Sequence, residues 1–409
     1  MTTYGGSVRK VGIPGGMLLV VAILLAVGLL WKVNAEYSMR SPGGNDFLVH
    51  WMGAKSLLDG ESPYSDATAV QIQEKAYGRM AIPGEHELRV AYPLYAEFLF
   101  VPFALVPDFG VARALWMTVL ELAAMVFASL AFFLTDRTQS KWRFLFFLLF
   151  SMVWYLGIRA IINGNAIVLV GFLLALSIWW LKHNSDLLFG ISLALVTIKP
   201  QVALILVLCI LGWVLYTRRK RAILSFLLAM GSLVALSLLL LPDWIVQNWR
   251  EVLRYPAYNP PSTPAAIGES IGGFVGQGVG WCISAGVIIF LLIQWWRMRS
   301  TGFAGLLRSM SWTIILSPLA GLQTDTGNEL LLLIPLAWLL AGGSSNNPVR
   351  IFPFISVLVV IFIGLWAFFL ATVQTGAQPQ QSPLMLLLLP LFMGSWMLWN
   401  DWRNRLGER

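Results

Sequence analysis

The sequence predicts an all-α, polytopic membrane protein, and three observations support this fold class. Only 12% of the 409 residues are charged and 58% are hydrophobic, whereas a soluble globular chain carries about 25% charged residues. The apolar residues form runs long enough to cross a hydrocarbon core about 30 Å thick. Basic residues cluster between these runs, as in Arg218–Arg221 and Arg297–Arg308, which is the pattern that orients membrane helices.

The apolar runs predict about twelve transmembrane helices in one integral-membrane domain, residues 1–409. We expect both chain ends and the basic clusters on the cytoplasmic side of a cell membrane, of the bacterial cytoplasmic type. Two ambiguous runs make the number of spans eleven, twelve or thirteen. Residues 92–107 are a short run framed by prolines, and residues 186–216 are a long run broken at Lys199-Pro200. The expected spans lie near 14–34, 92–107, 111–134, 143–161, 165–182, 186–216, 222–241, 275–296, 302–320, 328–342, 351–373 and 383–400.

Two long segments, 35–91 and 242–274, are too polar to lie in lipid and are expected on the outer face. The first carries eight of the chain's twenty acidic residues. Within it, Phe47, Trp51, Ala54 and Leu58 recur at helical spacing. We therefore expect an amphipathic helix in the membrane interface, its apolar face toward lipid, ending at Gly60, where a helix C-terminal glycine belongs.

Asp46 stands at the start of this predicted helix, after the flexible stretch "SPGG". One interpretation is a helix cap, in which Asn45 or Asp46 accepts backbone N–H bonds. The other is a carboxylate held at the membrane surface as a general base. Gly43 and Gly44 would let the backbone approach a ligand closely.

Two further candidates are ionisable groups inside apolar runs. Glu97 lies one turn into "AYPLYAEFLF", and a charge at membrane depth usually faces a partner or a cavity; Arg89 or Arg113 could pair with it. Lys199 precedes a proline between two apolar runs. It either extends toward the interface or presents an ammonium group to an anion at a helix break.

Polar breaks supply the remaining candidates. In "IRAIINGNAIVLV", Arg159, Asn163 and Asn165 stand between two apolar runs, in either a plain turn or a site. Asp325 and Glu329 stand at the end of a span, where a solvated turn is the simpler interpretation.

Several chemistries are disfavoured. The sequence has no phosphate-cradling glycine loop and no HExxH or paired metal-ligand spacing, and its three histidines are scattered. We expect no metal, no cofactor and no nucleic-acid partner.

The segments "NDFLVHWMGAKSLLDGESPY", "AYPLYAEFLFVPFALVP", "NGNAIVLVGFLLAL", "FGISLALVTIKPQVALILVL", "GESIGGFV" and "LSPLAG" resemble, in the same order, motifs of glycosyltransferase family 87. This resemblance implies a GT-C-like fold and inverting transfer of a hexose, mannose in that family, from a polyprenyl-phosphate donor. The acceptor would be a lipid or glycan at the outer membrane face, among membrane lipids. One departure is "LQTDTGNE", which follows "LSPLAG" where the family often has histidines. Another is Asn165, in place of the family's glutamine.

By resemblance, Asp46 is the catalytic base. Such a transfer also needs positive charge beside the leaving phosphate, and Lys199, Arg89 and Arg159 are the candidates for it. The candidates for the substrate pocket are His50, Tyr92, Glu97, Asn163, Asn165 and Asp325.

Two other functions compete with this one. A polytopic transporter or lipid flippase would typically carry an internal repeat and midplane ionisable residues, and no repeat is visible here. An accessory subunit that has lost catalysis is the third possibility.

Overall fold

A computed structural model describes residues 13–41, 43–135, 141–259, 262–322, 324–341, 351–372 and 383–407. Within these ranges the regular elements are helices, and no strand is present. The all-α prediction is therefore confirmed for the described residues. The longer helices are α1 (Ile13–Arg40), α2 (Asn45–Leu58), α3 (Asp66–Tyr77), α6 (Phe109–Phe133), α7 (Lys141–Val153), α8 (Tyr155–Asn163), α9 (Ile167–Lys182), α10 (Asp186–Val196), α11 (Pro200–Tyr216), α12 (Lys220–Leu240), α13 (Trp244–Tyr258), α14 (Pro264–Arg297), α15 (Gly302–Leu316), α16 (Leu333–Leu340), α17 (Ile351–Thr372) and α18 (Pro383–Gly407).

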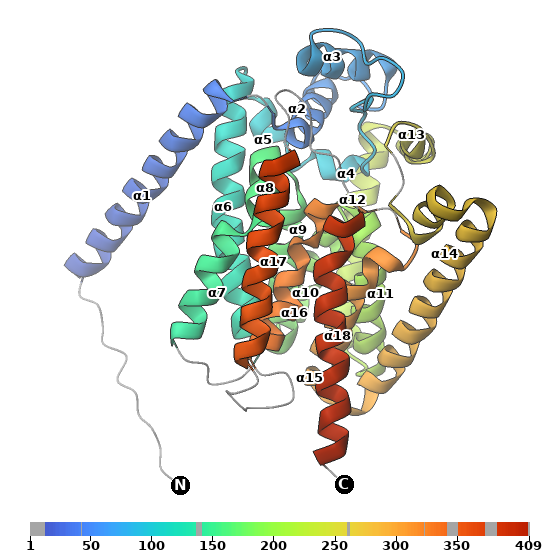
Figure 1. Cartoon of the computed structure of the whole chain (residues 1–409). Helices are drawn as coiled ribbons and strands as arrows, with labels where there is room; N and C mark the ends of the chain where they lie inside the picture. The colour runs from blue at the N-terminus through green and yellow to red at the C-terminus, as the bar shows by residue number, and fades with distance from the viewer. Residues whose placement is uncertain are drawn as a thin grey trace.

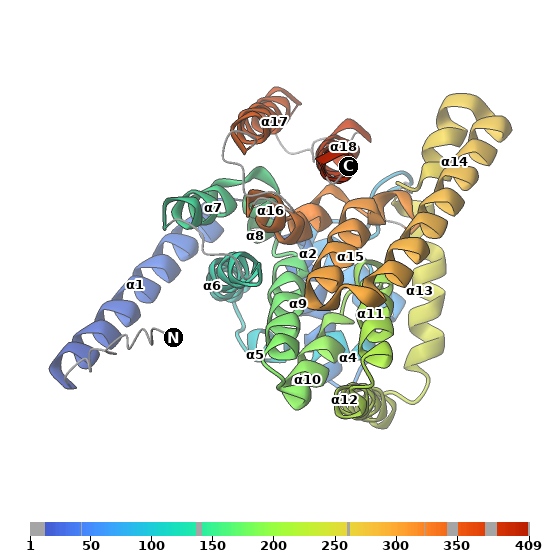
Figure 2. The same ribbon diagram turned by 90° about the horizontal axis from the view of Figure 1, so that it is seen from below.

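The helices form a bundle with a distinct cap at one end. Figure 1 shows α2, α3 and α13 at the top of the bundle, and α18 ending at the bottom. Seen from below, α9, α11 and α15 lie centrally, whereas α1, α14 and α17 lie at the periphery (Figure 2). The two long polar segments meet in this cap, because Ser62 donates a hydrogen bond to Gln247 over 2.6 Å.

Five helices in the described residues are long and apolar enough to cross a membrane, judged by length and composition. They run over 16–40, 109–133, 220–240, 264–300 and 352–372. The pair α7 and α8, bent by 46° at their junction, makes a sixth if it counts as one span. The protein is thus a multi-pass membrane protein.

Residues 92–107 do not form the span expected of them. They contain only two short helices, α4 (Leu94–Glu97) and α5 (Val101–Ala104). A four-residue helix rises about 6 Å, which is far short of a bilayer core. Pro93 precedes α4 and Pro102 lies in the first turn of α5, so the prolines that framed this run also explain why it breaks.

The break expected at Lys199-Pro200 is confirmed. Helix α10 ends at Val196 and α11 begins at Pro200, where proline is tolerated because its missing N–H needs no partner. Between the two helices the backbone of Lys199 is not helical. The long run 186–216 is therefore two helices.

Helix α2 is not an interfacial helix. The polar residues His50 and Ser56 are buried together with Phe47 and Trp51, whereas Leu58 of the predicted apolar face is exposed. Helices α3, α4, α5, α6 and α8 contact α2, so protein rather than lipid covers it. The expected ending is confirmed, since Gly60 has a φ of 77° and the N–H groups at 60 and 61 close the helix onto the carbonyls of 57 and 56.

Candidate active site

A close contact between α2 and the end of α8 builds the site. Gly164 follows α8 with a φ of 73°, and a Cβ placed on it would lie 2.4 Å from the Cβ of Phe47. Trp116 of α6 stacks on Phe47 and donates its indole N–H to the Gly164 carbonyl over 2.9 Å. Only glycine fits here. The neighbours of Phe47 and Gly164 are thereby brought face to face.

Asp46 faces the two asparagines that flank Gly164. Its Oδ2 accepts hydrogen bonds from Asn165 Nδ2 at 2.9 Å and from Asn163 Nδ2 at 3.2 Å. Gly44 holds the cap position of α2, and no side chain caps that end. Asp46 is therefore held by side chains from α8 and the turn after it, and not by the backbone of its own helix.

Lys199 completes a polar connection through the bundle. Its side chain is buried, and Nζ donates to Asn165 Oδ1 over 2.7 Å. The Asn165 amide thus bridges a carboxylate and an ammonium group, which come from α2 and from the α10–α11 break. We call Asp46, Asn165 and Lys199 the central polar chain.

The surroundings of Asp46 favour its neutral form. Burial raises the pKa of Asp46, and the nearby negative charge of Asp325 raises it further. The positive charge of Lys199 and the Asn165 hydrogen bond act in the opposite direction. Part of the residue's surface stays accessible, and a carboxylate whose pKa is raised is a stronger base.

Tyr92, His50 and Glu97 form a second layer beside this chain. The Tyr92 ring lies 6.0 Å from Lys199 Nζ and 4.5 Å from the His50 ring. His50 Nδ1 and Glu97 Oε1 are 2.8 Å apart, and both side chains are buried. We expected Arg89 or Arg113 to pair with Glu97, and that expectation was wrong: histidine, one helix away, is the partner.

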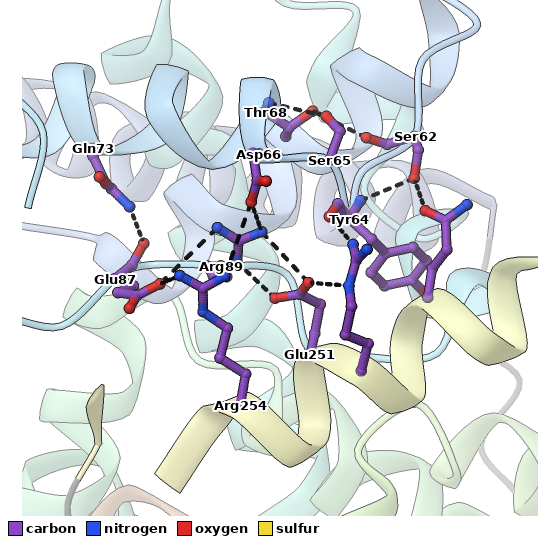
Figure 3. Close-up of polar contacts among 12 residues, drawn as sticks. Ser62, Tyr64, Ser65, Asp66, Thr68, Gln73, Glu87, Arg89, Glu251 and Arg254 are labelled. Atoms are coloured by element: carbon purple, nitrogen blue, oxygen red, sulfur yellow. Dashed lines mark hydrogen bonds and ion pairs between the residues drawn. The ribbon is translucent and has the colours of Figure 1, made fainter. Parts of the chain in front are cut away.

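Arg89 belongs to a separate cluster, shown in Figure 3. Its Nε contacts Glu251 Oε2 at 2.6 Å, and its Nη2 contacts Asp66 Oδ1 at 2.5 Å. Arg254 contacts Glu87 at 2.8 Å in the same group. These five residues, the outer ion-pair cluster, tie the first polar segment to α13.

Two other basic residues, Arg159 and Arg113, donate hydrogen bonds to uncharged groups. Arg159 of α8 donates to the Tyr155 hydroxyl at 2.7 Å, one turn before Asn163. Arg113 of α6 is buried and donates to the carbonyls of Ser41 and Ile162. A Cβ on Gly44 would lie 2.6 Å from Arg113 Nε. The close approach that the glycine allows is therefore to Arg113.

The predicted site residues thus fall into groups. The structure gathers Asp46, Asn163, Asn165, Lys199, Tyr92 and, by its electrostatic effect on Asp46, Asp325. It places Arg89 in the outer ion-pair cluster. The sequence interpretation missed Arg113 as the residue that fixes the turn before α2, although an arginine so near an apolar run was a usable signal.

The chemistry available is that of a base beside a cation. Among the described residues no group of three or more His, Cys, Asp or Glu side chains could hold a metal ion. The central polar chain instead offers a carboxylate that can take a proton and an ammonium group that can bind an anion. Both lie within one hydrogen-bonded chain.

Comparison with known proteins identifies the family. The model of glycosyltransferase family 87 matches residues 91–322, more than half of the chain. No curated protein and no solved structure matches. The matched range contains Tyr92, Asn165 and Lys199, and the family implies a membrane glycosyltransferase. The chain therefore belongs to glycosyltransferase family 87.

Proposed function

We propose that the protein transfers a hexose, mannose by resemblance, from a polyprenyl-phosphate donor to a lipid or glycan acceptor, with inversion at the anomeric carbon. In this proposal the chain has a GT-C-like fold with about twelve spans, and it acts at the outer face of a bacterial cytoplasmic membrane. Asp46 is the base and Lys199 binds the donor phosphate.

The central polar chain is the observation that carries this proposal. Inverting transfer needs a base for the acceptor hydroxyl on one side of the sugar and a cation beside the departing phosphate on the other. Asp46 and Lys199 are joined through a single amide, Asn165. A sugar bound across Asn165 would have the base at one end and the cation at the other.

The elements found at the two ends of the helix bundle support a site at the outer membrane face. Asp46 lies on α2, in the cap that α2, α3 and α13 form at one end of the bundle (Figure 1). Helix α12 begins beside the basic segment Arg218–Arg221 and ends just before α13. That basic segment therefore lies at the opposite end, and the positive-inside tendency assigns this end to the cytoplasm.

A donor panel tests the proposal. Purified protein in lipid vesicles is given polyprenyl-phosphate mannose, glucose and galactose with a membrane glycolipid extract, and radiolabelled product is counted. We expect transfer from one of these lipids and none from a nucleotide sugar. Transfer from nucleotide sugars, or from none of the lipid donors, would overturn the proposal.

A further inference from the structure

A hollow lies beside the central polar chain, among α11, α15 and the turn-rich segment before α16. Its apolar wall includes Val202, Ile314 and Leu332. Its polar wall consists of Gln201, Ser317, Thr324, Asn328 and Glu329. The lining of the hollow is thus mainly apolar, and these five residues are its polar part.

The polar wall presents three hydrogen-bond acceptors that have no partner among the described residues. Both carboxylate oxygens of Glu329, and Oδ1 of Asn328, are buried and find no hydrogen-bond partner among the described residues. The Asn328 amide group is already used, because Nδ2 donates to Thr324 Oγ1 over 3.1 Å. Ser317 likewise donates to the Ile314 carbonyl. Buried acceptors left unpaired are costly, so these three oxygens would gain from a ligand that donates hydrogen bonds.

The nature of these acceptors selects the ligand. No basic side chain from the part of the chain that the structure describes lines the hollow, so nothing in its wall would attract the charge of a phosphate group. A cation site would need further ligands, and in the described residues no group of three acidic, His or Cys side chains could hold a metal ion. Sugar hydroxyls are neutral donors and match the three acceptors.

The hollow adjoins the central polar chain at two points. Gly327, next to Asn328, is so close to Asn165 that a Cβ on it would lie 3.5 Å from Asn165 Nδ2. Gln201, in the wall of the hollow, follows Lys199 by two residues. A sugar that reaches from Asn165 into the hollow would therefore keep its phosphate toward Lys199.

We infer that Glu329 and Asn328 form the sugar-recognition subsite, accepting hydrogen bonds from hydroxyl groups on the donor hexose. The inference rests on the proposed function, since it assumes a sugar-bearing lipid donor. It makes Glu329 a residue that selects the sugar and takes no part in proton transfer. The solvated turn expected at this position is replaced by a buried recognition wall.

Binding of two lipids distinguishes this role. The full chain in nanodiscs is titrated with the accepted polyprenyl-phosphate sugar and with bare polyprenyl phosphate. We expect Glu329→Gln to weaken binding of the sugar lipid by roughly tenfold, since the amide keeps one acceptor oxygen and replaces the other with an NH2 donor. Binding of the bare lipid should not change. Glu329→Leu should show the same selectivity with a larger loss.

The matched control is Glu121→Gln, since Glu121 of α6 accepts a hydrogen bond from Asn34 of α1 at 2.7 Å, far from the hollow in the fold. It should leave both affinities unchanged. Equal weakening of both lipids by the Glu329 variants, or no weakening of either, would overturn the inference. If the wild-type protein binds none of the sugar lipids, the proposed function fails as well, and that result appears before any variant is made.

Singly deoxygenated sugar lipids sharpen the assignment. Removing the hydroxyl that Glu329 contacts should weaken binding to the wild-type protein by roughly tenfold but should cost the Glu329→Leu variant little. If the Glu329→Leu change and the removal of a hydroxyl weakened binding additively at every ring position, Glu329 would contact none of these hydroxyls, and the inference would be overturned.

Discussion

Two polar clusters lie near the same end of the bundle, and they differ in how their charges are satisfied. In the outer ion-pair cluster, Arg89 contacts Glu251 and Asp66, and Arg254 contacts Glu87. In the central polar chain, Asp46 and Lys199 are not paired with each other. The hydrogen-bond partners of both are asparagine amide groups.

This difference separates structure from chemistry. The arginines of the outer ion-pair cluster are already paired with carboxylates and are therefore poorly placed to bind a substrate. The cluster is suited to holding α13 onto the first polar segment. Charges separated by a neutral amide remain available, and a substrate that inserts between them gains from both. The predictions that follow test this contrast, beginning with the largest expected effect.

Asp46→Asn should reduce sugar transfer by about 10²–10⁴-fold, because an amide cannot take the acceptor proton. The unfolding midpoint in detergent at neutral pH should stay level or rise, since burial raises the Asp46 pKa and ionising the carboxylate in the folded protein is therefore costly. Asp59→Asn, an exposed change at the other end of α2, is the control and should leave both transfer and unfolding unchanged.

Lys199→Met should lower transfer by about 10²-fold, because it removes the charge that stabilises the leaving phosphate. Binding of the polyprenyl-phosphate donor should weaken too, as measured by titration in nanodiscs. Donor affinity and rate equal to those of the wild-type protein would place the phosphate elsewhere, with Arg159 as the next candidate.

Gly164→Ala should damage the close contact between α2 and the end of α8 that holds the central polar chain. Alanine at a φ of 73° is strained, and its Cβ would meet Phe47 at 2.4 Å. We expect a loss of about 1–3 kcal/mol of stability, the range typical of overpacking, together with loss of transfer. Thermal unfolding followed by size exclusion measures the first effect. Gly212→Ala, where nothing lies within 4 Å, should be tolerated.

Arg89→Met should act on stability far more than on chemistry. It leaves the buried Glu251 carboxylate without its main partner, at a cost of about 3–5 kcal/mol. The companion change Glu251→Leu in the same chain should recover part of that loss. A specific loss of donor binding with normal unfolding would instead make Arg89 a phosphate ligand.

The smallest effect concerns pH. Because burial raises the Asp46 pKa, the carboxylate becomes protonated as pH falls through a value above that of an ordinary aspartate. Transfer should therefore decline on the acid side at a higher pH than it would with an ordinary aspartate, whose pKa is about 3.9. A pH profile of kcat/KM that is flat down to pH 4 would contradict a base with a raised pKa.

Much of this arrangement follows from local sequence, and the rest depends on distant partners. The proline after Lys199 predicted the helix break, and Gly60 predicted the end of α2. Apolar periodicity could not reveal that α3–α6 and α8 cover α2, so the prediction of an interfacial helix was wrong. The pairing of Glu97 with His50, and of Arg89 with Glu251, joins segments whose contact no local pattern encodes.

The central claim is that the Asp46 carboxylate accepts the acceptor's proton during sugar transfer. The most direct measurement is a single-turnover reaction in which Asp46→Asn is first loaded with radiolabelled donor and then mixed with acceptor. We predict donor binding equal to that of the wild-type protein and no product on the time scale of the wild-type turnover. Product formed at the wild-type rate would contradict this account.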